Sequence, residues 1–210
     1  MSPPSLPPDL TKTPVVAILR GCPPAHAEVM AGAVIAAGLT VIEVTLDSES
    51  PLEQVANIRQ AFPQAKVGVG SVRRAYQVAP AVAAGASFVV TPVVASEVLA
   101  AALEAEVACI PGAATPTEID LATRLGATAV KVFPADLLGG AAYVRAVMSP
   151  LGSPALIPTG GVTPATVVAY LRAGAVAVGL GESLFPRSAL EAGDADTVAR
   201  LAKEVIGSLG

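Results

Sequence analysis

Eight short apolar runs, rich in valine, isoleucine and alanine, recur along the chain at an even spacing. They lie at residues 15–19, 41–46, 66–69, 87–91, 107–110, 127–133, 155–158 and 175–178. Stretches with apolar residues every three or four positions lie between them, the clearest at 25–37, 52–61, 96–105, 117–125 and 164–173. Short strands that alternate with helices in this way are typical of a parallel sheet with crossover helices.

Eight such units can close into a (β/α)8 TIM barrel, and an open doubly wound sheet is the alternative. The units are even, and no G-x-G-x-x-G motif opens a helix after the first run. Glycines such as Gly38 and Gly174 follow helical stretches and fit left-handed helix caps. We therefore predict an α/β fold, a single (β/α)8 barrel over residues 1–210, with a loose N-terminal segment at 1–12 and a closing helix at 195–209.

Composition narrows the classes of function open to the chain. Of its 210 residues 53% are hydrophobic and 14% charged, the net charge is −4 and no basic run occurs, so we expect no nucleic-acid partner. No stretch reaches the roughly 18 apolar residues of a membrane span, and the start does not resemble a signal peptide. We therefore expect a cytoplasmic protein with no membrane partner. One histidine and two distant cysteines, Cys22 and Cys109, indicate neither a metal site nor a disulfide framework.

Three ionisable residues interrupt the apolar runs. Arg20 ends the first run, Glu43 lies within the second and Lys131 lies within the sixth. Strands of a parallel sheet are buried on both faces, and a charge there is costly unless it is paired or functional. Because barrel active sites form at the carboxyl ends of strands, we expect these side chains to converge in the mouth of the barrel.

Lys131 is the only one of the four lysines that lies between valines within a strand. Burial disfavours the ammonium form, and a neutral amine can attack a ketone to form an imine, which acts as an electron sink for the neighbouring carbon. Glu43 would then transfer the proton. A buried Lys131–Glu43 pair without chemistry is the structural alternative.

Glycine turns follow the last two runs. Pro158-Thr159-Gly160-Gly161-Val162 follows the seventh run and Gly179-Leu180-Gly181 the eighth. Loops at these two places in a barrel often bind phosphate with backbone N–H groups, and glycine permits the close approach. The alternative is that these segments are ordinary tight turns, but two such loops together favour a phosphate-binding site.

The sequence resembles the 2-keto-3-deoxy-6-phosphogluconate (KDPG) aldolase family, which includes 4-hydroxy-2-oxoglutarate (KHG) and phosphogalactonate aldolases. The similar segments are VVAILRG (15–21), GLTVIEVTL (38–46), VGVGSV (67–72), FVVTP (88–92), IPGAATPTE (110–118), AVKVFPA (129–135), PTGGV (158–162) and AVGLG (177–181). Glu43 in EVTL and Lys131 in KVFPA are the most specific of these matches. Eight ordered segments make a chance similarity improbable.

The resemblance implies a homotrimeric class I aldolase that acts on a small 2-keto acid without a metal or cofactor. Lys131 would form the Schiff base and Glu43 would be the general acid and base. The resemblance also implies a set of substrate-binding residues, which are Arg20, Ser71, Pro92, Phe133, Thr159, Gly160, Gly161 and Gly181. The reaction expected is cleavage of 2-dehydro-3-deoxy-6-phosphogluconate to pyruvate and glyceraldehyde 3-phosphate.

Two acidic residues depart from the family pattern at the substrate site. Asp47 stands where the family usually has an arginine, and Glu182 stands where it usually has a serine, although Ser183 follows. Arg73 and Arg74 are candidates to replace the missing positive charge, or they form a solvated helix start. The alternatives are therefore a KHG or phosphogalactonate aldolase, with oxaloacetate decarboxylation through the same imine. From other classes, a phosphosugar isomerase or epimerase and a non-catalytic phosphate-binding barrel stay open.

Overall fold

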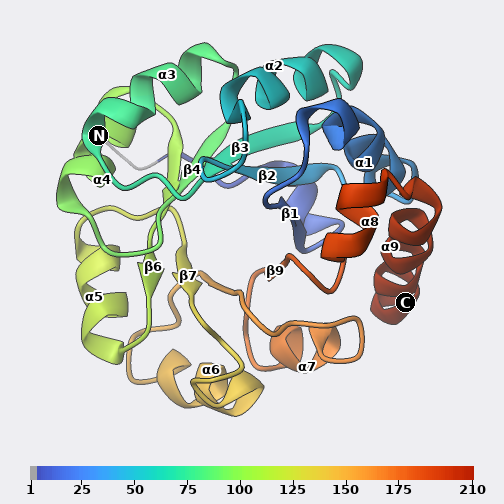
Figure 1. The fold of residues 1–210 in the computed structure, drawn as a ribbon. Helices are drawn as coiled ribbons and strands as arrows, with labels where there is room; N and C mark the ends of the chain where they lie inside the picture. The colour runs from blue at the N-terminus through green and yellow to red at the C-terminus, as the bar shows by residue number, and fades with distance from the viewer. Residues whose placement is uncertain (1–3) are drawn as a thin grey trace.

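The computed structural model describes residues 4–210, in which parallel strands form a ring and helices surround it (Figure 1). The strands are β1 (Val15–Leu19), β2 (Val41–Thr45), β3 (Lys66–Gly70), β4 (Phe88–Val90), β5 (Ala108–Ile110), β6 (Gly112–Ala113), β7 (Val130–Val132), β8 (Leu156–Pro158) and β9 (Val178–Leu180). The α-helices are α1 (Pro24–Ala36), α2 (Pro51–Ala61), α3 (Val78–Ala83), α4 (Ser96–Glu104), α5 (Pro116–Arg124), α6 (Gly140–Met148), α7 (Val167–Arg172), α8 (Arg187–Ala192) and α9 (Ala195–Leu209). None of these helices, within residues 4–210, is long and apolar enough to cross a membrane.

Hydrogen bonds connect the strands around the whole ring. Regular parallel pairing runs in the order β5-β4-β3-β2-β1-β9 and in the order β6-β7-β8. Pro111 separates β5 from β6, and its carbonyl oxygen accepts a bond from Lys131 N at 2.8 Å, so the two short strands form one side of the ring. At the other junction Val176 N donates to Leu156 O at 3.0 Å, and Thr159 forms a parallel bridge with Gly179. The fold is the predicted (β/α)8 barrel.

The predicted elements agree with the structure except at a few ends. The fifth run matches β5, and the strand continues beyond that run as the additional strand β6, because Pro111 lacks an N–H group and interrupts the ladder between the two. The last strand begins at Val178 rather than at 175, because Ala175 N is still bonded to Tyr170 O in the turn after α7. Gly38 and Gly174 have φ values of 103° and 107°, which confirms the predicted left-handed helix caps.

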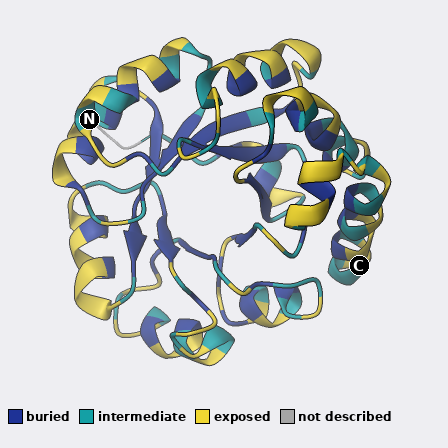
Figure 2. Cartoon of the chain, in the orientation of Figure 1, coloured by how far each residue is buried: buried dark blue, intermediate teal, exposed yellow. Residues whose placement is uncertain are grey.

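Two apolar layers hold the barrel together. Residues on the outer face of the strands pack against the helices in the larger cluster, which includes Ile42, Val44, Val130 and Val132. Alternate residues point to the barrel interior, where a smaller cluster includes Val16, Ile18, Val41, Phe88, Val90, Ala129 and Ile157. Figure 2 shows the strands buried and the outer helix faces exposed.

The N-terminal segment differs from the loose segment predicted at 1–12. Residues 1–3 lie outside the described residues, but Pro8–Thr11 form a 3-10 helix. Leu10 is 5% exposed and belongs to the interior cluster, and Thr40 Oγ1 donates to Asp9 Oδ1 at 3.0 Å. Leu10 clusters with Val16 and Val41, near the amino ends of their strands, so this segment covers the bottom of the barrel.

We expect Leu10→Ala to lower the free energy of unfolding by about 2–3 kcal/mol, because it removes a buried side chain and leaves a cavity at the end of the barrel. Urea denaturation followed by circular dichroism measures the change. Leu137→Ala is the matched control, since Leu137 is 81% exposed and its removal should change stability by no more than about 0.5 kcal/mol. Equal effects of the two substitutions would contradict the role assigned to Leu10.

Candidate active site

Lys131 and Glu43 meet inside the barrel. Glu43 lies two residues after the interior residue Val41 on β2, and Lys131 lies two residues after Ala129 on β7. Successive side chains of a strand point to opposite faces, so both residues share the interior face with their apolar predecessors. The two strands lie on opposite sides of the ring, and Lys131 Nζ is 3.6 Å from Glu43 Oε1.

Glycines on β3 make room for the interior side chains. An added Cβ at Gly70 would lie 2.7 Å from Glu43 Cγ and would overlap the carboxylate, and one at Gly68 would overlap the Phe88 ring. Both glycines lie on the face of β3 that points into the barrel, where any larger residue would displace a neighbouring side chain. The two glycines of the Gly68-Val69-Gly70-Ser71 segment are therefore explained by packing in the barrel interior.

The surroundings of the pair suit proton transfer next to an amine. The Lys131 and Glu43 side chains are 9% and 2% exposed, and buried Glu43 Oε1 has no hydrogen-bond partner among the described residues. Lys131 Nζ also lies 5.6 Å from the centroid of the Phe133 ring, within the range of a cation–π contact. The arrangement gives a buried amine with a carboxylate oxygen facing it, and such a pair can form an imine and move a proton.

Arg20, Asp47 and Ser71 form a polar group at the ends of three neighbouring strands. Arg20 Nη1 donates to Asp47 Oδ2, and Arg20 Nη2 donates to Ser71 Oγ at 3.3 Å. Arg20 and Asp47 are about half exposed, and Ser71 has a left-handed backbone with φ 59°. Asp47, which departs from the family pattern, therefore partly neutralises Arg20 and fixes its guanidinium group.

The predicted substrate-binding residues all line one pocket with a volume of about 1080 Å³. Lys131 lines it as well, together with Arg20, Ser71, Pro92, Phe133, Thr159, Gly160, Gly161 and Gly181. Their position in a single pocket agrees with the sequence analysis, although their roles toward a substrate stay predictions. Arg73 and Arg74, by contrast, do not line this pocket as the described residues form it.

Packing also explains two glycines near the ends of β8 and β9, of which Gly161 lies in the loop after β8 and Gly179 lies within β9. An added Cβ at Gly161 would overlap the Asp136 carboxylate, and one at Gly179 would overlap the Thr159 hydroxyl. Ser183 Oγ donates to Val162 O at 2.7 Å, so this hydroxyl joins the loop after β9 to the loop after β8. Glu182 is exposed and lines the pocket beside them. The loops are therefore fixed in place with their backbone at the pocket wall.

Sequence analysis missed two charged residues of the pocket, Arg187 and Glu191. They belong to α8, which has six residues and is too short to give a recognisable helical pattern. Pro186, immediately before the helix, was the available signal, since proline often precedes or begins a helix.

Neither cysteine belongs to the site. Cys22 and Cys109 are free and buried. Burial raises the pKa of Cys22 to about 11 and that of Cys109 to about 12, so both remain protonated thiols at neutral pH.

The fold and the site define a (β/α)8 barrel enzyme with a buried lysine–glutamate pair. Residues 8–201 match the family model of KDPG and KHG aldolases. The KHG/KDPG aldolase of Escherichia coli K12 is 37% identical over 197 residues, which cover 94% of this chain and 92% of that protein. The chain belongs to the KDPG and KHG aldolase family and is an aldolase.

Other relatives show the breadth of this family. The 2-dehydro-3-deoxy-6-phosphogalactonate aldolase of Escherichia coli K12 is also 37% identical, over 83% of this chain and 86% of that protein. The KDPG aldolase of Legionella pneumophila, solved with pyruvate captured as a covalent carbinolamine, has a TM-score of 0.87 and 28% identity, over 94% of this chain and 96% of that one. A native KDPGal structure has a TM-score of 0.88 and 33% identity, with 95% of both chains covered.

We expect Gly70→Ala to reduce turnover on the order of 10²-fold, because the new Cβ displaces the Glu43 carboxylate from its position facing Lys131. Aldol cleavage coupled to pyruvate detection measures turnover, and thermal unfolding shows whether the variant is folded. Gly207→Ala in α9 is the control, since an added Cβ there meets nothing within 4 Å. A folded Gly70→Ala enzyme with full turnover would show that Glu43 tolerates displacement.

Proposed function

We propose that the protein is a class I aldolase that cleaves 2-dehydro-3-deoxy-6-phosphogluconate to pyruvate and glyceraldehyde 3-phosphate. The observation that carries this proposal is the buried pair of Lys131 and Glu43, with 3.6 Å between Nζ and Oε1, of which Lys131 lines the pocket. Family membership and the covalent carbinolamine of the Legionella pneumophila relative support an imine mechanism.

The proposed reaction begins when Glu43 takes a proton from Lys131 and the neutral amine attacks the C2 carbonyl of the substrate. Glu43 then returns this proton to the carbinolamine hydroxyl group, which leaves as water, so that a protonated imine forms and Glu43 is again a carboxylate. Glu43 accepts the proton of the C4 hydroxyl as the C3–C4 bond breaks, and the bond electrons move to the imine nitrogen to form an enamine. Glyceraldehyde 3-phosphate leaves, Glu43 gives the proton it accepted to C3 of the enamine, and water hydrolyses the resulting protonated imine to release pyruvate and the lysine.

We assign roles to the remaining pocket residues from their positions in the pocket. Arg20 and Ser71 lie at the mouth of β1 and β3 and would bind the substrate carboxylate, while Pro92 and Phe133 would shape the pocket around the pyruvyl group. The far end of the substrate would reach the loops after β8 and β9, where Thr159, Gly160, Gly161 and Gly181 lie and where backbone N–H groups would bind phosphate.

Charges in the pocket favour a second candidate, an aldolase for unphosphorylated 4-hydroxy-2-oxoacids. Asp47 neutralises part of the positive charge of Arg20, and Glu182 adds a negative charge beside the glycine loops. The phosphogalactonate substrate and oxaloacetate decarboxylation are variants of the same chemistry. Turnover of the phosphorylated and unphosphorylated 2-keto acids by one preparation separates the candidates, and a higher kcat/KM for 4-hydroxy-2-oxoglutarate would favour the second.

Imine formation gives the direct test of the proposed mechanism. Incubation with pyruvate and borohydride should add a reduced pyruvyl mass to the peptide that carries Lys131, and Lys131→Ala should abolish both the adduct and nearly all turnover. Peptide mass spectrometry locates the adduct. An adduct on Lys66 instead, or no adduct, would contradict the Schiff-base mechanism and would leave an isomerase, an epimerase or a binding barrel as the explanation.

Glu43→Gln separates imine formation from proton transfer in the same experiment. The substitution keeps the shape of the side chain and removes the base, so turnover should fall by a factor on the order of 10²–10⁴ while pyruvate is still trapped on Lys131. Steady-state kinetics and mass spectrometry of the same sample measure the two effects. Full turnover by this variant would rule out Glu43 as the general acid and base.

We also propose a homotrimer. Helices of the outer ring expose apolar side chains, among them Val29 on α1 and the neighbouring Leu121 and Leu125 at α5, and apolar surface of this kind marks interfaces. Light scattering should give about three chains per particle, and a monomer at working concentration would contradict the proposal. Cytoplasmic location stays a prediction from the sequence.

A further inference from the structure

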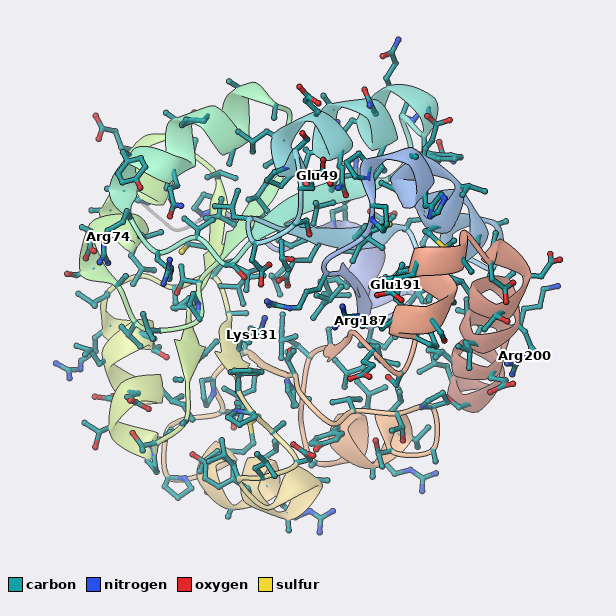
Figure 3. The ribbon with its side chains drawn as sticks, in the orientation of Figure 1. Glu49, Arg74, Lys131, Arg187, Glu191 and Arg200 are labelled. Carbon is teal, nitrogen blue, oxygen red and sulfur yellow. The ribbon has the colours of Figure 1, made fainter. Side chains whose placement is uncertain are left out.

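The helix α8 places an ion pair at the outer part of the pocket. Arg187 and Glu191 are four residues apart, and Arg187 Nε donates to Glu191 Oε1 at 2.7 Å. Both residues line the pocket that Lys131 also lines, and Figure 3 shows them on the side of α8 that faces the barrel opening. Arg200 of α9 lies at the outside of the barrel in the same view.

Other cations of the pocket already have partners close to the reacting centre. The described lining residues include five charged side chains, which are Arg20, Lys131, Glu182, Arg187 and Glu191. Lys131 faces Glu43 in the barrel interior, and Arg20 pairs with Asp47 at the mouth of β1. Arg187 is therefore the cation that remains for the outer end of the pocket, beside the loops after β8 and β9.

The Arg187–Glu191 pair can exchange partners at small cost. The two side chains are 86% and 59% exposed, and an exposed ion pair one helical turn apart adds little stability because water screens it. A phosphate dianion attracts the guanidinium group more strongly than a carboxylate does, and the planar fork of arginine can bind two of its oxygens. An arriving phosphate can thus replace Glu191 as the partner of Arg187.

The helix that carries Arg187 is itself held firmly. Ala189 and Leu190 of α8 are buried. His26 Nδ1 of α1 lies 2.8 Å from Leu190 O, and because a carbonyl oxygen only accepts, Nδ1 is the nitrogen that carries the proton and donates. The backbone of α8 is therefore fixed against α1, while the Arg187 side chain extends into solvent and contacts Glu191.

We propose that Arg187 is a specificity-determining residue that binds the terminal phosphate of a phosphorylated 2-keto-3-deoxy acid, with Glu191 holding the guanidinium group when no substrate is bound. Arg187 offsets the negative charge of Glu182 at this end of the pocket. The inference rests on the proposed function, since it assumes that the keto group of the substrate reacts at Lys131. It assigns phosphate recognition to a side chain in addition to the backbone of the glycine loops.

Substrate preference of an Arg187→Gln enzyme tests the proposal. The measured quantity is the ratio of kcat/KM for 2-dehydro-3-deoxy-6-phosphogluconate to kcat/KM for the same acid without phosphate. This ratio should fall about 10- to 100-fold, mainly through a higher KM for the phosphorylated acid, because a charged hydrogen-bond partner of the phosphate is lost. Arg187→Lys should retain part of the preference, since it keeps the charge but loses the fork.

Two further variants show whether the effect belongs to the pocket. Arg200→Gln breaks a matched pair, in which Arg200 Nη1 donates to Glu204 Oε1 at 2.7 Å on α9, and it should leave the ratio unchanged. Glu191→Gln should lower KM for the phosphorylated acid, because it removes the competing carboxylate. An unchanged ratio in Arg187→Gln, or an equal fall of both kcat/KM values, would overturn the proposal.

Pyruvate trapping distinguishes failure of this inference from failure of the proposed function. If borohydride traps pyruvate on Lys131 in the native enzyme and in Arg187→Gln while the ratio is unchanged, the aldolase proposal stands and the role of Arg187 is wrong. If the native enzyme traps no pyruvate, the proposed function fails and the inference falls with it.

Discussion

The contact between Lys131 and Glu43 is the constraint around which the rest of the barrel is arranged. Each ion loses its hydration inside the barrel, a loss that costs several kcal/mol, and the opposite charge offsets part of it. Removing one partner would leave the other as an uncompensated buried charge. β3 accommodates this pair because Gly70 leaves space for the carboxylate, and no side chain competes for the interior there.

The inward-facing residues along the strands decide which end of the barrel carries the reactive groups. On β1, β2 and β7 the interior residues change from Val16, Val41 and Ala129 to charged residues toward the carboxyl ends. The amino ends of these three strands are apolar and Leu10 packs with Val16 and Val41, whereas the pocket that Lys131 lines is formed at the carboxyl ends. The inward-facing residues of these strands are thus apolar at the amino ends and charged at the carboxyl ends, where the reactive groups lie.

How far the sequence predicts this structure depends on the range of the interactions involved. The position of Glu43 and Lys131 follows from local patterns, since a charge within a buried strand is visible without knowledge of its neighbours. The burial of Leu10 was missed because a proline-rich segment looks loose until the bottom of a barrel is there to receive it. Arg187 was missed for a similar reason, because packing against α1 rather than helical periodicity fixes the short helix α8.

Three ion pairs along the pocket differ in how readily their charges can be redirected. Lys131–Glu43 is buried, Arg20–Asp47 is half exposed, and Arg187–Glu191 is largely exposed. The Coulomb attraction within a pair weakens as water enters its surroundings, so the energy needed to replace one partner falls from the barrel interior to the pocket rim. An anionic substrate therefore meets an exchangeable cation at the rim, while the buried pair keeps its geometry for proton transfer. Charge pairing in this pocket thus orients the buried groups and still leaves positive charge available where the substrate arrives.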